Sequence, residues 1–180
     1  MFVQTEVTPN PNSLKFLPGK NVSNSGSFEV TKKEETNNEL VRNLLSINGV
    51  TGVFLGQDFL SVNKKEEVVW EDIKHIVISL INDFYASGKE FVIASELFEE
   101  KKEEYKEIEK KIISLLETKI RPAVAKDGGD IKFKEFKDGI VKVELQGSCS
   151  GCPSSTMTLK QGVQNLLCHY LPEVKEVVAV

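Results

Sequence analysis

The amino-acid sequence predicts an α+β fold made of two small α+β domains, each combining helices with a β-hairpin. Two stretches, 50–62 and 131–145, contain paired β-rich runs around turn-forming residues, which is typical of hairpins. Two others, 70–84 and 153–170, carry apolar residues at helical spacing. A run of charged residues at 99–104 separates the two halves and is typical of a solvated linker.

The length of 180 residues fits one ordinary domain or two small ones. The run of charged residues at 99–104 favours two small domains. We therefore expect a first domain at residues 1–88, a charged linker at 89–102 and a second domain at 103–180.

The first domain is expected to open with two short strands around a rigid connector. Between Thr8 and Ser13, prolines fix φ and asparagine side chains can bond to their own backbone. Asn48-Gly49 and Gly88 are expected to end helices. The expected elements are strands at 2–7 and 14–17, a polar loop at 19–38, a helix at 39–46, a hairpin of 50–55 and 59–62, and a helix starting at Trp70.

The second domain is expected to place a hairpin between two helices. Arg121-Pro122 should lie near the end of the first helix, because proline disfavours helical backbone in the residue before it. The expected elements are a helix through 105–116, a turn at 127–130, a hairpin of 131–136 and 140–145, a helix at about 153–170 and a strand at 174–180.

The composition is that of a globular protein, with 40% hydrophobic and 28% charged residues. The net charge of -4 gives no global reason to expect nucleic acid or an anionic membrane as a partner, and no apolar run is long enough to span a bilayer. Three cysteines do not resemble a secreted disulfide framework, so a reducing compartment is expected. The chain is interpreted as cytoplasmic in a bacterium or, alternatively, as the processed form of a protein of the mitochondrial matrix.

The central motif is Cys149-Ser150-Gly151-Cys152-Pro153, which directly follows the second hairpin. Two thiols separated by two residues can converge on one metal centre when a tight turn brings them to the same side. Pro153 suits the first position of a helix, which would put Cys152 at its N-cap. The positive end of the helix dipole would then stabilise thiolates.

Four chemistries compete for this motif. A thiol-disulfide oxidoreductase of the thioredoxin type uses the same spacing, but too little chain follows the motif to complete that sheet. A zinc site completed by Cys168 or His169 fails on distance, because Cys168 would lie roughly 20 Å or more along the helix. An inert structural pair fits poorly in a turn of Gly and Ser. An iron-sulfur cluster shared by two subunits satisfies the usual need for four thiolates.

Longer motifs resemble one known family in both halves of the chain. The motifs of the second half are Arg121-Pro122, Asp127-Gly128-Gly129-Asp130, Leu145-Gln146-Gly147-Ser148-Cys149 and Gly151-Cys152-Pro153-Ser154-Ser155. Those of the first half are Gln4-Thr5, Thr8-Pro9-Asn10-Pro11-Asn12-Ser13-Leu14-Lys15-Phe16 and Pro18-Gly19-Lys20. With these motifs, the second half resembles the NifU C-terminal domain, and the first half resembles the Nfu N-terminal domain.

The resemblance implies a scaffold or carrier of iron-sulfur clusters that is not an enzyme. It implies that Cys149 and Cys152 are the cluster ligands, that a 4Fe-4S cluster bridges the two subunits of a homodimer, and that the cluster is received from assembly factors and passed to apo-proteins. The oxidoreductase remains the alternative.

Other polar residues are assigned to structure. Asp127 and Asp130 flank two glycines, which is more often turn chemistry than a metal site. His75 and His169 have no ligand partner at metal spacing. Cys168 projects away from the apolar stripe of its helix and is expected to face solvent or a partner.

Overall fold

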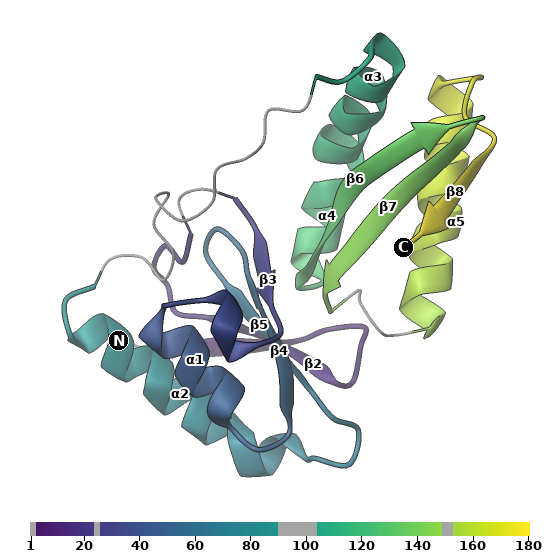
Figure 1. Cartoon of the computed structure of the whole chain (residues 1–180). Helices are drawn as coiled ribbons and strands as arrows, with labels where there is room; N and C mark the ends of the chain where they lie inside the picture. Colours follow the sequence, from purple (N-terminus) through teal and green to yellow (C-terminus); the bar gives the residue numbers. More distant parts are fainter. Residues whose placement is uncertain (1–2, 24–25, 90–103, 149–152) are drawn as a thin grey trace.

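The computed structural model describes residues 3–23, 26–89, 104–148 and 153–180. It confirms the α+β class, with one sheet and its helices in each of two domains (Figure 1). The division at 89–102 stays a prediction, because nearly all of that segment lies outside the described residues. Within the described part of the chain, no helix combines the length and apolar character needed to cross a membrane.

The first domain contains β1 (Gln4–Val7), β2 (Ser13–Leu17), β3 (Phe28–Val30), the 3-10 turn η1 (Lys33–Glu35), α1 (Glu39–Ser46), β4 (Val50–Leu55), β5 (Leu60–Lys64) and α2 (Trp70–Ala86). Its five strands form one antiparallel sheet in the order β1-β2-β5-β4-β3. The predicted hairpin is β4–β5, and the predicted helices are α1 and α2.

The two faces of this sheet differ in polarity and in what they contact. Because successive strand residues point to opposite faces, each strand presents apolar side chains to one side and mostly polar ones to the other. Leu14, Val53 and Val62 belong to the first core, which α1 and α2 cover (Figure 1). The opposite face carries Lys15, Glu29, Phe54, Ser61 and Asn63, and it lies toward the second domain.

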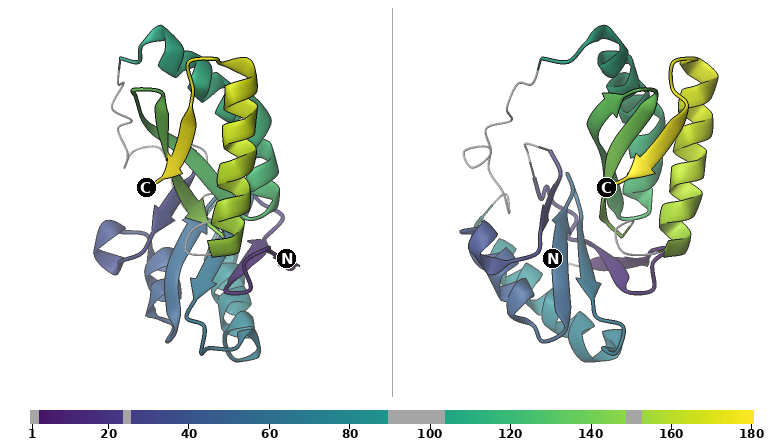
Figure 2. Two further views of the ribbon diagram at one scale, coloured as in Figure 1. Left: turned by 90° about the vertical axis from the view of Figure 1, so that its right-hand side faces the viewer. Right: turned by 45° about the vertical axis from the view of Figure 1, so that its right-hand side comes forward.

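The second domain contains α3 (Glu107–Leu115), the π-helical turn η3 (Leu116–Ile120), α4 (Arg121–Lys126), β6 (Gly129–Lys137), β7 (Ile140–Gly147), α5 (Pro153–Tyr170) and β8 (Glu176–Ala179). Strands β6 and β7 form the predicted antiparallel hairpin, and β8 joins β7 in parallel. Helices α3, α4 and α5 lie beside the sheet (Figure 2), and their side chains pack with it into a second core.

The region around Arg121-Pro122 departs from the sequence prediction. The helix does not end there: η3 leads directly into α4, which runs to Lys126. Pro122 lies in the first turn of α4, directly after the π-helical turn η3.

Strand β3 lies inside the stretch that was expected to be a loop. Its three residues pair with β4, with Phe28 opposite Leu55 and Val30 opposite Val53. Val30 is only 2% exposed. The strand therefore exists because β4 offers an edge, a long-range cause that its short, polar surroundings do not reveal.

Candidate functional site

Both predicted ligands, Cys149 and Cys152, lie outside the described residues. The structure describes the chain that leads to them and the helix that follows. Strand β7 ends at Gly147, Ser148 comes next, and α5 begins at Pro153. The site is therefore described from these flanking residues.

Two glycine turns meet immediately before the cysteine motif in the chain. Gly128 follows α4 with φ +81°, and Gly147 ends β7 with φ +67°, both in the left-handed region that favours glycine. A Cβ on Gly147 would lie 2.6 Å from the Gly128 oxygen. The two turns can approach this closely only because both residues lack a side chain.

Ser148, the residue before Cys149, is anchored to the first of these turns. Its side chain is 2% exposed. Its N–H donates to the Gly128 oxygen at 3.3 Å, and its hydroxyl donates to the Asp127 oxygen. The residue before Cys149 is thus buried and hydrogen-bonded.

The carboxylate of Asp130 has a structural partner. Its two oxygens accept from Nε and Nη2 of Arg121, each at 2.9 Å, and Oδ1 also accepts from the Ile131 N–H at 2.8 Å. This paired geometry supports the assignment of Asp130 to structure. Among the described residues there is no group of three or more His, Cys, Asp or Glu side chains that could hold a metal ion.

The first domain contacts the same two turns with polar side chains. Asn10 Nδ2 donates to the Ser148 oxygen and Asn63 Nδ2 to the Gly147 oxygen, both at 3.1 Å. Ser61 Oγ donates to the Gly128 oxygen at 2.6 Å. These first-domain contacts were missed by sequence reasoning, which interpreted Asn10 only as part of a rigid connector.

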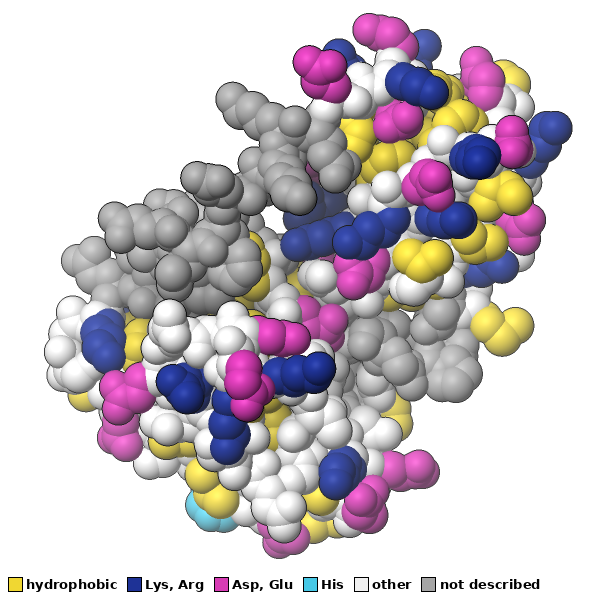
Figure 3. Space-filling view, in the orientation of Figure 1, with side chains coloured by type: hydrophobic (Ala, Val, Ile, Leu, Met, Phe, Trp, Pro, Cys, Tyr) yellow, Lys and Arg dark blue, Asp and Glu magenta, His cyan; other side chains and the backbone are white. Residues whose placement is uncertain are grey.

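Further bonds join the domains around this contact. Lys15 Nζ donates to the Ala125 oxygen at 3.3 Å, and Lys132 Nζ donates back to the Ser27 oxygen at 2.9 Å. Burial lowers the pKa of Lys132. Elsewhere, on the face in Figure 3, acidic and basic side chains are interspersed over both lobes of the molecule.

Glu29 accepts from the Gly147 N–H at 3.3 Å. Its half-buried position raises its pKa above the ordinary value of 4.5, because burial disfavours the charged carboxylate; the bond from Gly147 opposes the shift and nearby Glu144 adds to it. A raised acid pKa means that the folded state is penalised once Glu29 ionises. The penalty is complete above the raised pKa and vanishes below about 4.5.

We therefore expect Glu29→Gln to stabilise the protein at pH 7, by at most about 1 kcal/mol, because glutamine keeps the acceptor and removes the desolvated charge. Thermal unfolding at pH 7 and pH 4 would measure the gain, which should disappear at the lower pH. Glu35→Gln is the matched control. The pKa of Glu35 is lowered by bonds from the Thr31 and Lys32 N–H groups, so this change should not stabilise. A gain from Glu29→Gln that persists at pH 4 would contradict the explanation.

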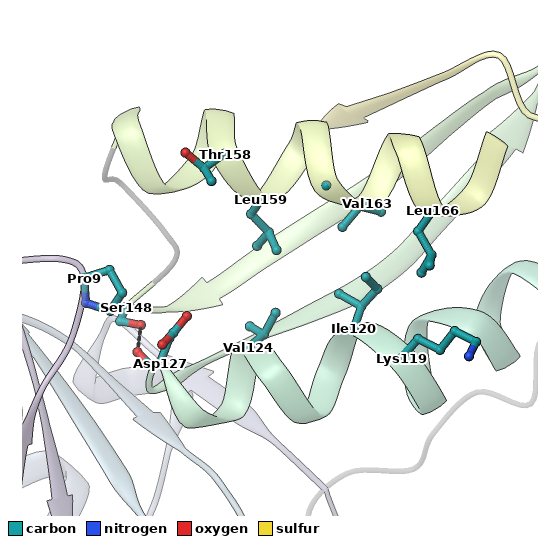
Figure 4. Close-up of a pocket in the computed structure, with 11 residues that line it drawn as sticks. Pro9, Lys119, Ile120, Val124, Asp127, Ser148, Thr158, Leu159, Val163 and Leu166 are labelled. Carbon is teal, nitrogen blue, oxygen red and sulfur yellow. Dashed lines mark hydrogen bonds between the residues drawn. The ribbon is translucent and has the colours of Figure 1, made fainter. Parts of the chain in front are cut away.

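A cavity of about 530 Å³ is lined in part by Ser148, the residue before Cys149 (Figure 4). It lies between α4 and α5, and Ser148 and Pro9 are at one end of it. Its walls are mainly apolar. The lining residues are Pro9, Lys119, Ile120, Val124, Asp127, Ser148, Thr158, Leu159, Gly162, Val163 and Leu166.

Cys168, which was predicted to face solvent or a partner, is only partly exposed. The side chain is partly buried against the second core, and its thiol donates to the Val174 oxygen at 3.2 Å. The chain after α5 turns back to place β8 beside β7, and this return covers the side of the helix that carries Cys168. His75 and His169 are both exposed.

Comparison with known proteins assigns each half of the chain to a family model. Residues 3–88 match the family described as "Scaffold protein Nfu/NifU N terminal", and residues 112–178 match the "NifU-like domain". A solved structure of a NifU-like protein from Saccharomyces cerevisiae is 32% identical, covering 53% of this chain and 87% of its own, with a TM-score of 0.48.

Two curated relatives align over nearly the whole chain. "NFU1 iron-sulfur cluster scaffold homolog, mitochondrial" of Homo sapiens is 47% identical over 98% of this chain and 71% of its own length. "NifU-like protein 4, mitochondrial" of Arabidopsis thaliana is 45% identical over 98% of this chain. The present chain spans 65% of the length of the Arabidopsis protein.

Proposed function

The chain belongs to the Nfu family of iron-sulfur cluster scaffold proteins, which are not enzymes, and on this premise we propose that Cys149 and Cys152 hold a 4Fe-4S cluster as cargo. The cluster bridges two copies of the chain and is passed to apo-proteins. Membership of the family rests on the comparisons, whereas the ligands, the cluster type, the homodimer and the transfer are proposed.

One observation carries the ligand assignment. Of the three cysteines, only Cys149 and Cys152 stand between the end of β7 and the start of α5. Cys168 lies 15 residues after Pro153 on the same helix, which corresponds to roughly 20 Å or more, and its thiol is occupied by the Val174 oxygen. One chain therefore offers two thiolates at the motif, and a second copy supplies the other two.

Two ligands on each of two chains also support a cluster that can be transferred to another protein. A bridging cluster loses half its ligands when the two subunits separate, so release requires no unfolding. A resident redox centre more often has all its ligands on one chain, enclosed by apolar side chains that tune its potential. The thiol-disulfide oxidoreductase has no support from the relatives, which are named as scaffolds.

We further propose that residues 1–88 and 103–180 are separate folding units joined by the linker at 89–102. The partners are apo iron-sulfur proteins and upstream assembly factors. Of the two compartments considered, the mitochondrial matrix has the better support, since the relatives described above are named mitochondrial, whereas nothing among them favours the bacterial cytoplasm.

Transfer to a client protein tests the proposed function. Protein reconstituted anaerobically should activate an apo-protein that needs a 4Fe-4S cluster faster than equal amounts of free iron and sulfide do, even with a chelator present. The Cys149→Ser chain, treated identically, is the control and should give only the rate of free iron and sulfide. If the chelator blocks activation completely, or if the cluster stays on the loaded protein, the carrier function is wrong.

A further inference from the structure

The described part of the first domain forms hydrogen bonds with the backbone immediately before the proposed cluster ligands. Asn10 and Asn63 donate to the carbonyl oxygens of Ser148 and Gly147, which are the two residues immediately before Cys149. No side chain of the second domain is needed for these two bonds, because both acceptors are backbone oxygens.

The amide of Asn10 is held in one orientation. Its Oδ1 accepts from the Asn12 N–H at 3.0 Å, which leaves Nδ2 to face Ser148. The side chain of Thr8 bonds to the Asn10 and Ser13 oxygens and closes the turn around it. Asn10 is 6% exposed. It is therefore a preorganised donor, not a flexible surface amide.

Close approach of the domains depends on the two glycines. A Cβ on Gly128 would lie 2.8 Å from Ser61 Oγ and 3.2 Å from Thr8 Cγ2. A Cβ on Gly147 would lie 3.0 Å from Phe54 Cγ. The glycine turns thus serve as the docking surface of the second domain in addition to allowing the positive φ angles.

The hydrogen bonds from Asn10 and Asn63 act at and next to Gly147, which has no side chain to restrict its backbone. Glycine has the largest backbone freedom of all residues, so Gly147 would otherwise let the direction of the chain vary just before the first ligand. Fixing the carbonyls of Gly147 and Ser148 removes this freedom before a cluster arrives. A ligand set that is ordered in advance loses less entropy on binding.

We propose that Asn10 and Asn63 are positioning residues: by docking the first domain on the glycine turns, they fix the two peptide groups that precede Cys149 and so slow the loss of the cluster. This gives the first domain a role within its own chain, and it rests on the proposed function of Cys149 and Cys152. Docking itself does not depend on a cluster and can be measured without one.

The test uses the full chain with Asn10→Asp and Asn63→Asp, alone and together. Aspartate keeps the size of the side chain, and at position 10 it keeps the acceptor for Asn12, but it replaces the donor with an oxygen that repels the carbonyl. Asn38→Asp is the matched control, because Asn38 caps α1 by accepting from the Val41 N–H, which aspartate also does.

Two measurements are needed. Amide hydrogen exchange on the apo-protein reports docking through the protection of Gly147, whose N–H bonds to Glu29 of the first domain. Chelator extraction from loaded protein reports retention of the cluster. In the double variant we expect lost protection, normal iron content after reconstitution, a changed visible circular dichroism of the cluster, and release about tenfold faster than in the control.

Retained protection in the double variant would overturn the docking contacts. Lost protection with a release rate and dichroism equal to those of Asn38→Asp would overturn the positioning role. If Asn10→Asp unfolds its turn, the Asn63→Asp variant alone tests the proposal. Asn63 lies on β5, and its Oδ1 has no hydrogen-bond partner among the described residues, so this substitution removes no other hydrogen bond made by that oxygen. If the unaltered protein binds no cluster, the proposed function fails, while the exchange data still report on docking.

Discussion

Replacing either Cys149 or Cys152 with serine is expected to leave the reconstituted protein with essentially no iron or sulfide. Each substitution removes one thiolate per chain, and so two of the four ligands of a cluster shared by a symmetric pair. Serine is a poor substitute because its hydroxyl stays protonated at neutral pH. Iron and acid-labile sulfide per chain, measured after anaerobic reconstitution, give the result directly.

Cys168→Ser is the matched control and should load normally. The thiol at this position donates to the Val174 oxygen, a role that a hydroxyl can take over, and it lies far along α5 from the motif. The effect should be confined to a small change in stability, because the side chain is packed against the second core. A Cys168→Ser protein without iron would overturn the ligand assignment.

The second large effect is expected from Arg121→Ala, which should destabilise the second domain by about 3 kcal/mol. The Asp130 side chain is 5% exposed, and Arg121 is its bidentate partner. Removing the guanidinium leaves a buried carboxylate whose remaining hydrogen-bond donor, among the described residues, is the Ile131 N–H. Breaking a buried ion pair from one side is costly for this reason. Glu117 also loses a contact, but that pair is 3.8 Å apart and exposed, so it adds little.

The single tryptophan allows the effect to be assigned to one domain. Trp70 belongs to α2 and packs against the first core, so its fluorescence follows the first domain, whereas circular dichroism follows both. In Arg121→Ala, urea titration should show an early transition by dichroism and an almost unchanged one by fluorescence. Arg42→Ala, at an exposed position of α1, is the matched control and should change neither.

The same experiment tests the domain boundaries. If residues 1–88 and 103–180 are separate folding units, the two probes should separate in Arg121→Ala. If both probes move together, the chain unfolds as one unit, and the proposed division at 89–102 would have to be withdrawn.

The sequence by itself determined most of the elements and the chemistry. Paired β-rich runs around turn residues located both hairpins, and apolar residues at helical spacing located α2 and α5, because these signals arise from neighbours along the chain. The cysteine pair and its longer motifs indicated the family. Local signals failed where the cause was distant: β3 forms because β4 offers it an edge. The partial burial of Cys168 likewise depends on the return of the chain to β8.

Only the tertiary structure decided what surrounds Gly147 and Ser148, the two residues before Cys149. Asn10 and Ser148 are 138 positions apart, and the group that Asn10 contacts is a backbone oxygen. Every residue carries a backbone oxygen, so the identity of a residue does not show whether its oxygen accepts such a bond. Gly128 was recognisable as a turn residue. That the turns at Gly128 and Gly147 also receive the first domain follows from packing between residues far apart in sequence, which pattern and propensity do not encode.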